Sequence, residues 1–159
     1  MGTESRPDAV VGVVSDTHGL LDPRVAVVFE GVDRILHAGD IGSAAVLLEL
    51  ETIAPLTAVL GNTVRDIPGY SLGLTVRITI AGVSFVMAHK PKQLEASGVL
   101  SGAQVAVNGH THAPSVEFRE GILRVNPGTA SRHQVGGDRP TVALVDIREG
   151  RAAARIVEL

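Results

Sequence analysis

The chain contains no cysteine and few aromatic residues, and both shortages limit what it can be. Without cysteine, disulfide bonds and thiolate metal ligands are excluded, so a metal site would need nitrogen and oxygen donors. Aromatic residues account for 3% of the 159 residues, although 45% are hydrophobic. The core must therefore consist mainly of valine, leucine, isoleucine and alanine, a composition that favours buried strands and helices packed through small side chains.

Positive charge and long hydrophobic runs are also lacking. The formal net charge of -3 gives no electrostatic attraction to a nucleic-acid backbone or to anionic lipid. No apolar run approaches the roughly 18 residues of a transmembrane helix, and residues 1–8 lack the apolar region of a signal peptide. We therefore expect a cytoplasmic protein without a membrane partner and without a strong signal for nucleic-acid binding.

The length of the chain predicts one domain, since globular domains usually run to roughly 100 to 200 residues. We expect a flexible N-terminus over residues 1–9 and a single domain over residues 10–159. No internal repeat, low-complexity tract or linker interrupts the sequence.

Strand, loop and helix alternate in the first half of the chain. The predicted elements are strands at 10–15, 34–38 and 56–60, a helix from Asp22-Pro23 to Gly31, and a helix over 44–53 capped by Ser43. The strand segments are too short for helices and too apolar for exposed edges. This order predicts a βαβαβ unit of parallel strands, whose following loops all gather on one rim.

Paired apolar runs separated by turns dominate the second half. The predicted elements are hairpins at 74–80/83–88, 116–118/122–125 and 141–147/152–157, a helix over 91–100 and a strand over 104–107. Two mixed β-sheets flanked by helices accommodate both halves of the chain. We therefore expect an α/β (α+β) fold built as a four-layer αββα sandwich.

Potential metal ligands follow these apolar runs, at the points where strands should end. The seven side chains are Asp16, His18, Asp40, Asn62, His89, His110 and His112. Glycine directly precedes Asp40, Asn62 and His110, and glycine beside a ligand lets the backbone turn sharply and approach a metal or phosphate closely. Each short motif is weak evidence alone. Carboxylate, amide and imidazole groups gathered on one rim are what a two-metal hydrolytic centre needs.

The series resembles the motifs of the calcineurin-like metallophosphoesterase superfamily, and the length resembles its small YfcE-like phosphodiesterase branch. The resemblance covers nearly the whole chain, including residues 125–129, which are similar to a late Asn-Pro-Gly-Ser loop of that branch. It implies the metallophosphoesterase fold and two divalent metal ions, with Mn²⁺ expected and Fe, Zn, Co or Ni as alternatives. One ion would be held by Asp16, His18 and His112, the other by Asn62, His89 and His110, with Asp40 bridging both.

The reaction that this resemblance implies is hydrolysis of a phosphate ester by a hydroxide that bridges the two metals. Asp40, Asn62 and His89 would be the catalytic residues. Two divalent ions outweigh two carboxylates and one hydroxide, so the site would attract an anionic phosphate, and the neutral Asn62 preserves this positive charge. A phosphodiester is the expected substrate, as a small molecule or a nucleotide-type ester, and a homo-oligomer stays open.

Several positions depart from the family pattern. Many members have histidine and then a carboxylate directly after the asparagine ligand, whereas this chain has Thr63 and Val64, and Asp66 comes two residues late. His89 is followed by Lys90-Pro91 instead of the common Gly-His. Without a strong general acid, esters with poor leaving groups should react slowly, since such catalysis is typically worth about 10²- to 10⁴-fold.

Basic and polar side chains near the ligands could contact a substrate phosphate. Lys90 directly follows a proposed ligand, and we expect it, Arg65 and Thr63 to bind substrate. Arg132 and His133 are further candidates, and solvated surface charge is the alternative for all the basic residues. His37 lies two residues before Gly39, and we expect it to pack within its strand or to support a ligand.

Two other functions stay open at this point. The first is a metal-binding scaffold of the same fold that acts through protein partners, as in the retromer subunit that resembles this branch. The second is hydrolysis of another substrate class, by a phosphomonoesterase or a pyrophosphatase. Intact ligand positions favour catalysis over the scaffold.

Overall fold

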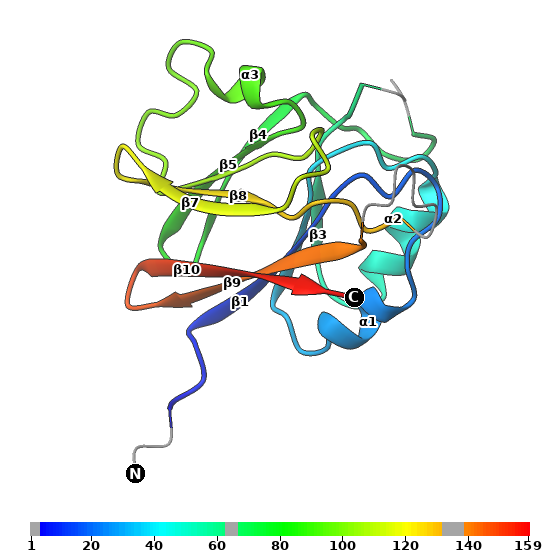
Figure 1. Cartoon of the computed structure of the whole chain (residues 1–159), viewed down its shortest axis with the longest axis horizontal. Helices are drawn as coiled ribbons and strands as arrows, with labels where there is room; N and C mark the ends of the chain where they lie inside the picture. The colour runs from blue at the N-terminus through cyan, green and yellow to red at the C-terminus, as the bar shows by residue number, and fades with distance from the viewer. Residues whose placement is uncertain (1–3, 63–66, 132–138) are drawn as a thin grey trace.

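The computed structural model describes residues 4–62, 67–131 and 139–159. Within these ranges the chain forms two five-stranded sheets that pack face to face (Figure 1). In chain order the elements are β1 (Ala9–Val14), α1 (Arg24–Val28), β2 (Arg34–His37), α2 (Ala44–Glu51), β3 (Leu56–Ala58), β4 (Thr75–Ile80), β5 (Val83–Ala88), α3 (Pro91–Leu94), β6 (Val105–Val107), β7 (Ser115–Arg119), β8 (Ile122–Asn126), β9 (Thr141–Arg148) and β10 (Arg151–Glu158). No helix among the described residues is long and apolar enough to cross a membrane.

The first sheet has the strand order β10-β9-β1-β2-β3. Its strands β1, β2 and β3 are parallel, and α1 and α2 connect them, which confirms the expected βαβαβ unit. The hairpin of β9 and β10 completes the sheet, with β9 antiparallel to β1.

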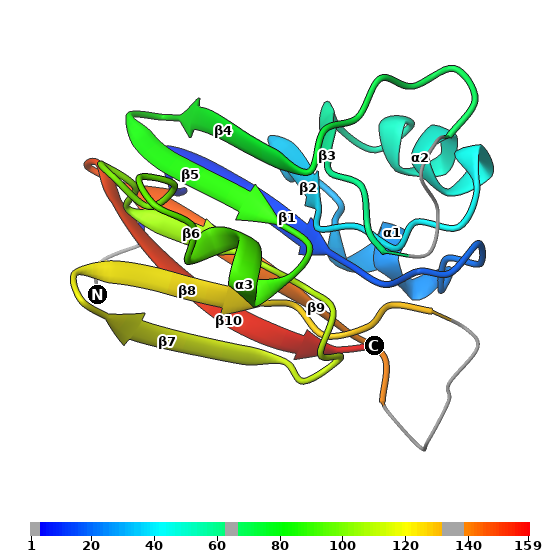
Figure 2. The ribbon, with the colours of Figure 1, turned by 90° about the horizontal axis from the view of Figure 1, so that it is seen from above.

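The second sheet has the strand order β4-β5-β6-β8-β7. Its inner strands β5, β6 and β8 are parallel, and the edge strands β4 and β7 are antiparallel to them. Both sheets are therefore mixed. Figure 2 shows them as separate layers, with α1 and α2 beside the first sheet and α3 on the second. The predicted αββα sandwich is confirmed, and its fourth layer is thin because α3 has only four residues.

The central strand β1 is buried on both faces, which explains why its sequence is apolar without alternation. Val11 and Val13 belong to the apolar layer between the two sheets. Val14 belongs to the layer under α1 and α2, together with Phe29. Leu94 of α3 packs in a third, smaller cluster on the outer face of the second sheet. The sequence of β1 thus positions its C-terminal end between two cores.

The helix ends differ in detail from the predictions. The first helix begins at Arg24, and Asp22 accepts a hydrogen bond of 2.9 Å from the Arg24 backbone N–H. Ser43 precedes α2 as expected, but its side chain makes no capping hydrogen bond. The expected helix over 91–100 stops at Leu94, and the chain then turns before Gly98, whose φ of 80° lies outside the right-handed helical region.

Parallel strands of both sheets end on the same side of the sandwich. In chain order, β1, β2, β3, β5 and β6 are followed by Asp16, Asp40, Asn62, His89 and the segment 109–112. Within the first sheet, the Asp16 N–H donates to the Gly39 carbonyl (3.0 Å). Within the second, the Gly109 N–H donates to the His89 carbonyl (3.0 Å). The topology therefore gathers the predicted ligands at one end of the molecule.

Candidate metal centre

The carboxylate of Asp16 lies at the middle of the predicted ligands. It is fully buried, and its Oδ1 lies 3.1 Å from His112 Nε2 and 3.8 Å from His18 Nε2. The same oxygen lies 3.9 Å from His89 Nε2, which comes from the other sheet. Side chains that are up to 96 residues apart in the sequence thus converge on one oxygen.

Asp40 and Asn62 lie on the other side of His89. Asp40 Oδ2 is 3.4 Å from His89 Nε2, and the side-chain oxygen of Asn62 is 2.9 Å from the same nitrogen. Two groups of ligand atoms, each within 4.8 Å of one another, could hold a metal ion: Asp16 with His18 and His112, and Asp16 with Asp40 and His89. Asp16 is common to both groups, whereas the sequence pointed to Asp40 as the shared ligand.

The histidine rings pair in the way that the expected ligand sets require. The His18 and His112 rings lie 5.5 Å apart between centroids, and the His89 and His110 rings lie 5.1 Å apart. His110 is exposed and belongs to neither of the two close groups of ligand atoms. The structure therefore brings all seven side chains into one neighbourhood, which we call the metal centre, with His110 at its edge.

Five of the seven candidate ligand residues have a left-handed backbone conformation. The φ angles are 54° at Asp16, 48° at His18, 54° at Asp40, 72° at His110 and 61° at His112. This conformation costs an L-residue roughly 1 to 2 kcal/mol, although Asp, Asn and His tolerate it better than most. Such strain persists only where the surrounding structure holds it, and it gathers at functional sites.

Two glycines allow the backbone to pass close to the carboxylates. A Cβ atom at Gly61 would lie 1.9 Å from Asp40 Oδ1, and one at Gly109 would lie 2.6 Å from Asp16 Oδ2. Both distances are far inside van der Waals contact, so no larger residue fits without displacing the carboxylate. The expectation that glycine beside a ligand permits close approach therefore has a physical basis at both positions.

Hydrogen-bond donors hold one oxygen of each carboxylate. Asp16 Oδ2 accepts from the Ser15 hydroxyl (2.6 Å) and from the His110 backbone N–H (3.1 Å). Asp40 Oδ1 accepts from the Asn62 backbone N–H (2.8 Å). These bonds leave Asp16 Oδ1 and Asp40 Oδ2 directed toward the histidine nitrogens, and they fix the orientation of both side chains.

The environment of His89 favours positive charge. Its Nδ1 lies 2.7 Å from the Ala38 carbonyl oxygen, so Nδ1 carries the proton and Nε2 faces the metal centre. Burial lowers the pKa of His89, but hydrogen bonds to Asp40 and Ala38 and the charges of Asp16 and Asp40 outweigh it, and the pKa is raised overall. A cation at this place, whether a proton or a metal ion, is therefore stabilised.

The Asn62 amide provides a direct test of whether the donors fit a metal. When the amide oxygen points toward the centre, that oxygen faces only acceptor atoms, including His89 Nε2 and the Asp40 carboxylate. With the amide rotated, its nitrogen donates to His89 Nε2 (2.9 Å) and to Asp40 Oδ2 (3.0 Å). A divalent cation among these nitrogen and oxygen atoms would satisfy them in the first orientation, so the donor set fits such an ion.

His37 supports the ligand loops from within the fold. It is fully buried, and its Nδ1 accepts from the Gly39 backbone N–H (3.1 Å). Thr17 Oγ1 donates its proton to the Ile41 carbonyl (2.8 Å). In the 3.0 Å contact between the two side chains, His37 Nε2 therefore donates to Thr17 Oγ1. Burial lowers the pKa of His37 to about 3, and the ring stays neutral. The expectation of a packing and supporting role agrees with these contacts.

The loop after β8 ties two ligand loops together. Asn126 is buried, and its Nδ2 donates to Thr111 Oγ1 (2.8 Å) and to the Gly109 carbonyl (3.3 Å). Thr129 Oγ1 donates to the Asp16 carbonyl (2.8 Å). The sequence marked this loop only by its likeness to a family motif, and it gave no sign of the part played by Ser15, which ends a buried apolar run.

The predicted substrate contacts are described only in part. Lys90 is exposed at the start of α3, and its backbone N–H donates to Gln93 Oε1 (2.8 Å). The other residues of interest lie outside the described residues: Thr63, Val64, Arg65, Asp66, Arg132 and His133. Among the described residues, Lys90 is thus the predicted substrate contact, and it directly follows the candidate ligand His89.

The family match and the similar proteins place this chain in the calcineurin-like phosphoesterase superfamily. Residues 10–150 match the calcineurin-like phosphoesterase superfamily domain. A probable metallophosphoesterase of Methanothermobacter thermautotrophicus is 34% identical over 93% of this chain and 91% of its own. A phosphodiesterase of Methanocaldococcus jannaschii is 30% identical over 86% of this chain and 92% of its own. Vps29 from Entamoeba histolytica, solved in complex with Zn²⁺, has a TM-score of 0.70 and 19% identity over 94% of this chain and 98% of its own.

Replacing His37 should weaken the dependence of stability on acid. His37 stays neutral in the folded protein down to about pH 3 but protonates near pH 6.5 when unfolded, so acid favours unfolding between these values. Over this window His37 should cost the wild type about 1.4 kcal/mol of unfolding free energy per pH unit. Urea unfolding of chelator-treated wild type and His37→Gln between about pH 6 and 4 checks this. Equal slopes for the two proteins would contradict it.

Asn126→Ala should weaken metal binding by about tenfold, because the loop that carries His110 and His112 loses two supporting hydrogen bonds. Calorimetric titration with Mn²⁺ measures the affinity. Thr141→Val is the matched control, since Thr141 donates to the Pro127 carbonyl (2.6 Å) in the same loop without touching a ligand loop. Equal Mn²⁺ affinities for the two variants would show that Asn126 serves stability alone.

Proposed function

Because the chain belongs to the calcineurin-like phosphoesterase superfamily, we propose that it is a phosphodiesterase whose centre holds two divalent metal ions. The superfamily comprises metal-dependent phosphoesterases, and the metal centre offers candidate ligands for such ions. The observation that carries the proposal is the convergence of Asp16, Asp40 and His89 from both sheets on one buried point. The diesterase activity rests on the relative from Methanocaldococcus jannaschii that carries this name.

The ligands divide into two sets that share a carboxylate. In this proposal one ion is held by Asp16, His18 and His112, the other by Asn62, His89 and His110, with Asp40 between them. The close ring pairs support the division, and the single buried carboxylate oxygen of Asp16 near both sets supports a short separation. Bound ions would polarise the phosphate oxygens and activate the attacking water. Mn²⁺ is the proposed metal, and Zn²⁺ is the ion in the Vps29 structure.

The chain's own residues orient the substrate and keep the centre rigid. The Asn62 N–H and the Ser15 hydroxyl each hold one carboxylate oxygen, so the other oxygen of each carboxylate faces the histidine nitrogens without reorganisation. Lys90, exposed beside His89, contacts a phosphate oxygen in this proposal, and Thr63 and Arg65 are proposed as further contacts. Because Thr63 stands where the superfamily pattern commonly has histidine, the leaving group departs with little help from a general acid in this proposal.

A scaffold that acts through protein partners is the second candidate. It is favoured by the fold shared with Vps29, a structure with 19% identity to this chain. A metal-binding scaffold would use the same left-handed ligand backbone and the same oriented carboxylates. The relative from Methanocaldococcus jannaschii that is named a phosphodiesterase supports the enzyme over the scaffold.

Hydrolysis of an activated aryl phosphodiester should require metal and Asp40. With Mn²⁺ added, the wild type should hydrolyse bis-(p-nitrophenyl) phosphate, and Asp40→Asn should lose on the order of 10³-fold in kcat/KM, because a shared ligand contributes several kcal/mol to transition-state stabilisation. Absorbance of released p-nitrophenol is the measurement. Bound ions without turnover under any metal would favour the scaffold. Faster hydrolysis of p-nitrophenyl phosphate would make the protein a phosphomonoesterase.

Lys90→Ala should raise KM for the same diester by about fivefold and leave kcat little changed, since an exposed ammonium contributes modestly to binding. Lys92→Ala is the matched control, because Lys92 is also exposed and lies two residues further along α3. Steady-state kinetics of both variants provide the measurement. If the two variants behave alike, Lys90 does not contact the phosphate.

A further inference from the structure

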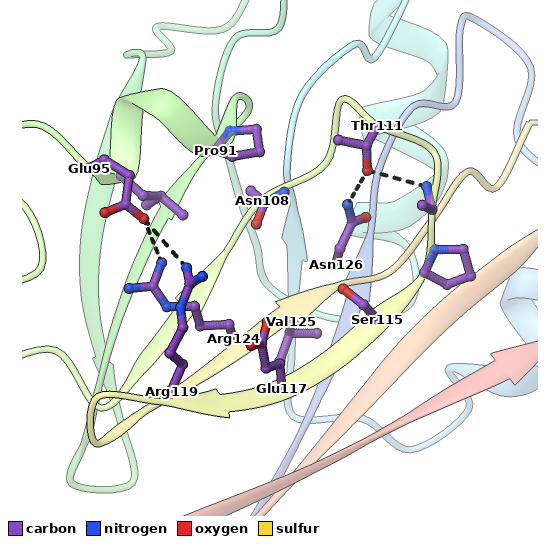
Figure 3. Close-up of a pocket in the computed structure, with 13 residues that line it drawn as sticks. Pro91, Glu95, Asn108, Thr111, Ser115, Glu117, Arg119, Arg124, Val125 and Asn126 are labelled. Carbon is purple, nitrogen blue, oxygen red and sulfur yellow. Dashed lines mark hydrogen bonds and ion pairs between the residues drawn. The ribbon is translucent and has the colours of Figure 1, made fainter.

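A cavity of about 370 Å³ lies on the outer face of the second sheet (Figure 3). Pro91, Leu94 and Glu95 line it from α3 and the following turn, and Ser115 and Glu117 line it from the edge strand β7. Its volume falls within the roughly 300 to 1,000 Å³ of small-molecule sites. Because α3 is so short, the sheet between it and β7 is left uncovered.

This cavity shares a wall with the metal centre. Thr111 lines the cavity, and its neighbours on either side are His110 and His112. Asn126, which also lines the cavity, holds Thr111 Oγ1 through its side-chain nitrogen (2.8 Å). Pro91 lies two residues beyond His89. A group in the cavity would therefore lie beside the loop that carries His110 and His112, since Thr111 lines the cavity (Figure 3).

The charges of the cavity favour an uncharged occupant. Glu95 Oε1 lies 2.7 Å from Arg124 Nη1 and 3.8 Å from Arg119 Nη2. With Glu117 on the same face, the two arginines and two glutamates that line the cavity cancel in formal charge. An anion in the cavity could bind an arginine only by competing with the Glu95 carboxylate, which already pairs with both arginines. The phosphate itself is thus better placed at the metal centre.

The remaining lining offers apolar surface with hydrogen-bonding groups at its edge. Pro91, Ala113 and Pro114, all exposed, provide the apolar part. Within the described residues, the Ser115 hydroxyl makes no hydrogen bond and the Asn108 side-chain oxygen accepts none, so both are available to a ligand. A flat ring attached to a hydroxylated sugar has this combination of an apolar face and polar edges.

We propose that the cavity binds the nucleoside part of a phosphodiester whose phosphate lies at the metal centre. This inference rests on the proposed phosphodiesterase function and names the substrate class: a nucleoside 5′-phosphate esterified to a second alcohol. Binding energy from the nucleoside would then help to position the phosphate beside the exposed Lys90.

Two esters with the same leaving group isolate the contribution of the nucleoside. The p-nitrophenyl ester of thymidine 5′-phosphate and methyl p-nitrophenyl phosphate both release p-nitrophenol and differ only in the alcohol that is retained. With Mn²⁺ added, we expect the wild type to prefer the thymidine ester by at least about tenfold in kcat/KM, the size of effect that one filled pocket supplies.

Ser115→Phe should reduce this preference about tenfold, because the added ring projects from β7 into the cavity. Val116→Phe is the matched control: Val116 is the next residue of the same strand, so its side chain points to the opposite face, and the preference should persist. If Ser115→Phe does not fold, Glu117→Trp tests the same point, with Phe118→Trp as its control.

Binding of thymidine to the Mn²⁺-free protein separates the two proposals. Saturation-transfer NMR should detect thymidine with the wild type and Val116→Phe but not with Ser115→Phe. If neither ester is hydrolysed while this binding pattern holds, the phosphodiesterase proposal fails and the cavity assignment stands. No preference between the esters, or thymidine binding that Ser115→Phe leaves intact, would overturn the cavity assignment.

Discussion

The buried carboxylate of Asp16 joins the two sheets, and the metal centre depends on that junction. It ends the central strand of the first sheet, yet its Oδ2 accepts from the backbone of His110 in the second sheet. Its own carbonyl accepts from Thr129, which precedes β9. A carboxylate removed from water needs donors or cations around it. Loops from distant parts of the chain therefore meet at Asp16 because this charge must be satisfied there.

Donors and acceptors are arranged in two zones around that charge. In the outer zone, neutral groups such as Thr17, His37 and Asn126 bind the backbone of the ligand loops. In the inner zone, carboxylate oxygens and histidine nitrogens face one another, and the raised pKa of His89 reflects their shared preference for a cation. These outer groups are uncharged, so they hold the ligand loops in place without competing for a cation.

The sequence predicted the strands well and placed the candidate ligands at the ends of strands, because both depend on local patterns. Apolar runs too short for helices marked β1 and β2, and polar residues directly after them marked the rim. The prediction of a helix as far as residue 100 was wrong, because α3 ends at Leu94. Gly98, with a φ of 80°, lies outside the right-handed helical region within the predicted range. The role of Asn126 was beyond prediction because it depends on Thr111 in another loop. Ser15 donates to the neighbouring Asp16, but nothing in its buried apolar run distinguishes it from a strand residue.

The left-handed backbone at the ligand positions has a consequence for how this fold can diverge. His18, His110 and His112 can be exchanged for Asn or Gly, which also adopt that conformation with little penalty, so a ligand can be removed while the loops keep their course. A β-branched replacement would instead displace the loop itself. A single substitution can thus remove a metal ligand without changing the fold. A hydrolase of this fold could therefore evolve into a protein that only binds partners, with every intermediate still folded.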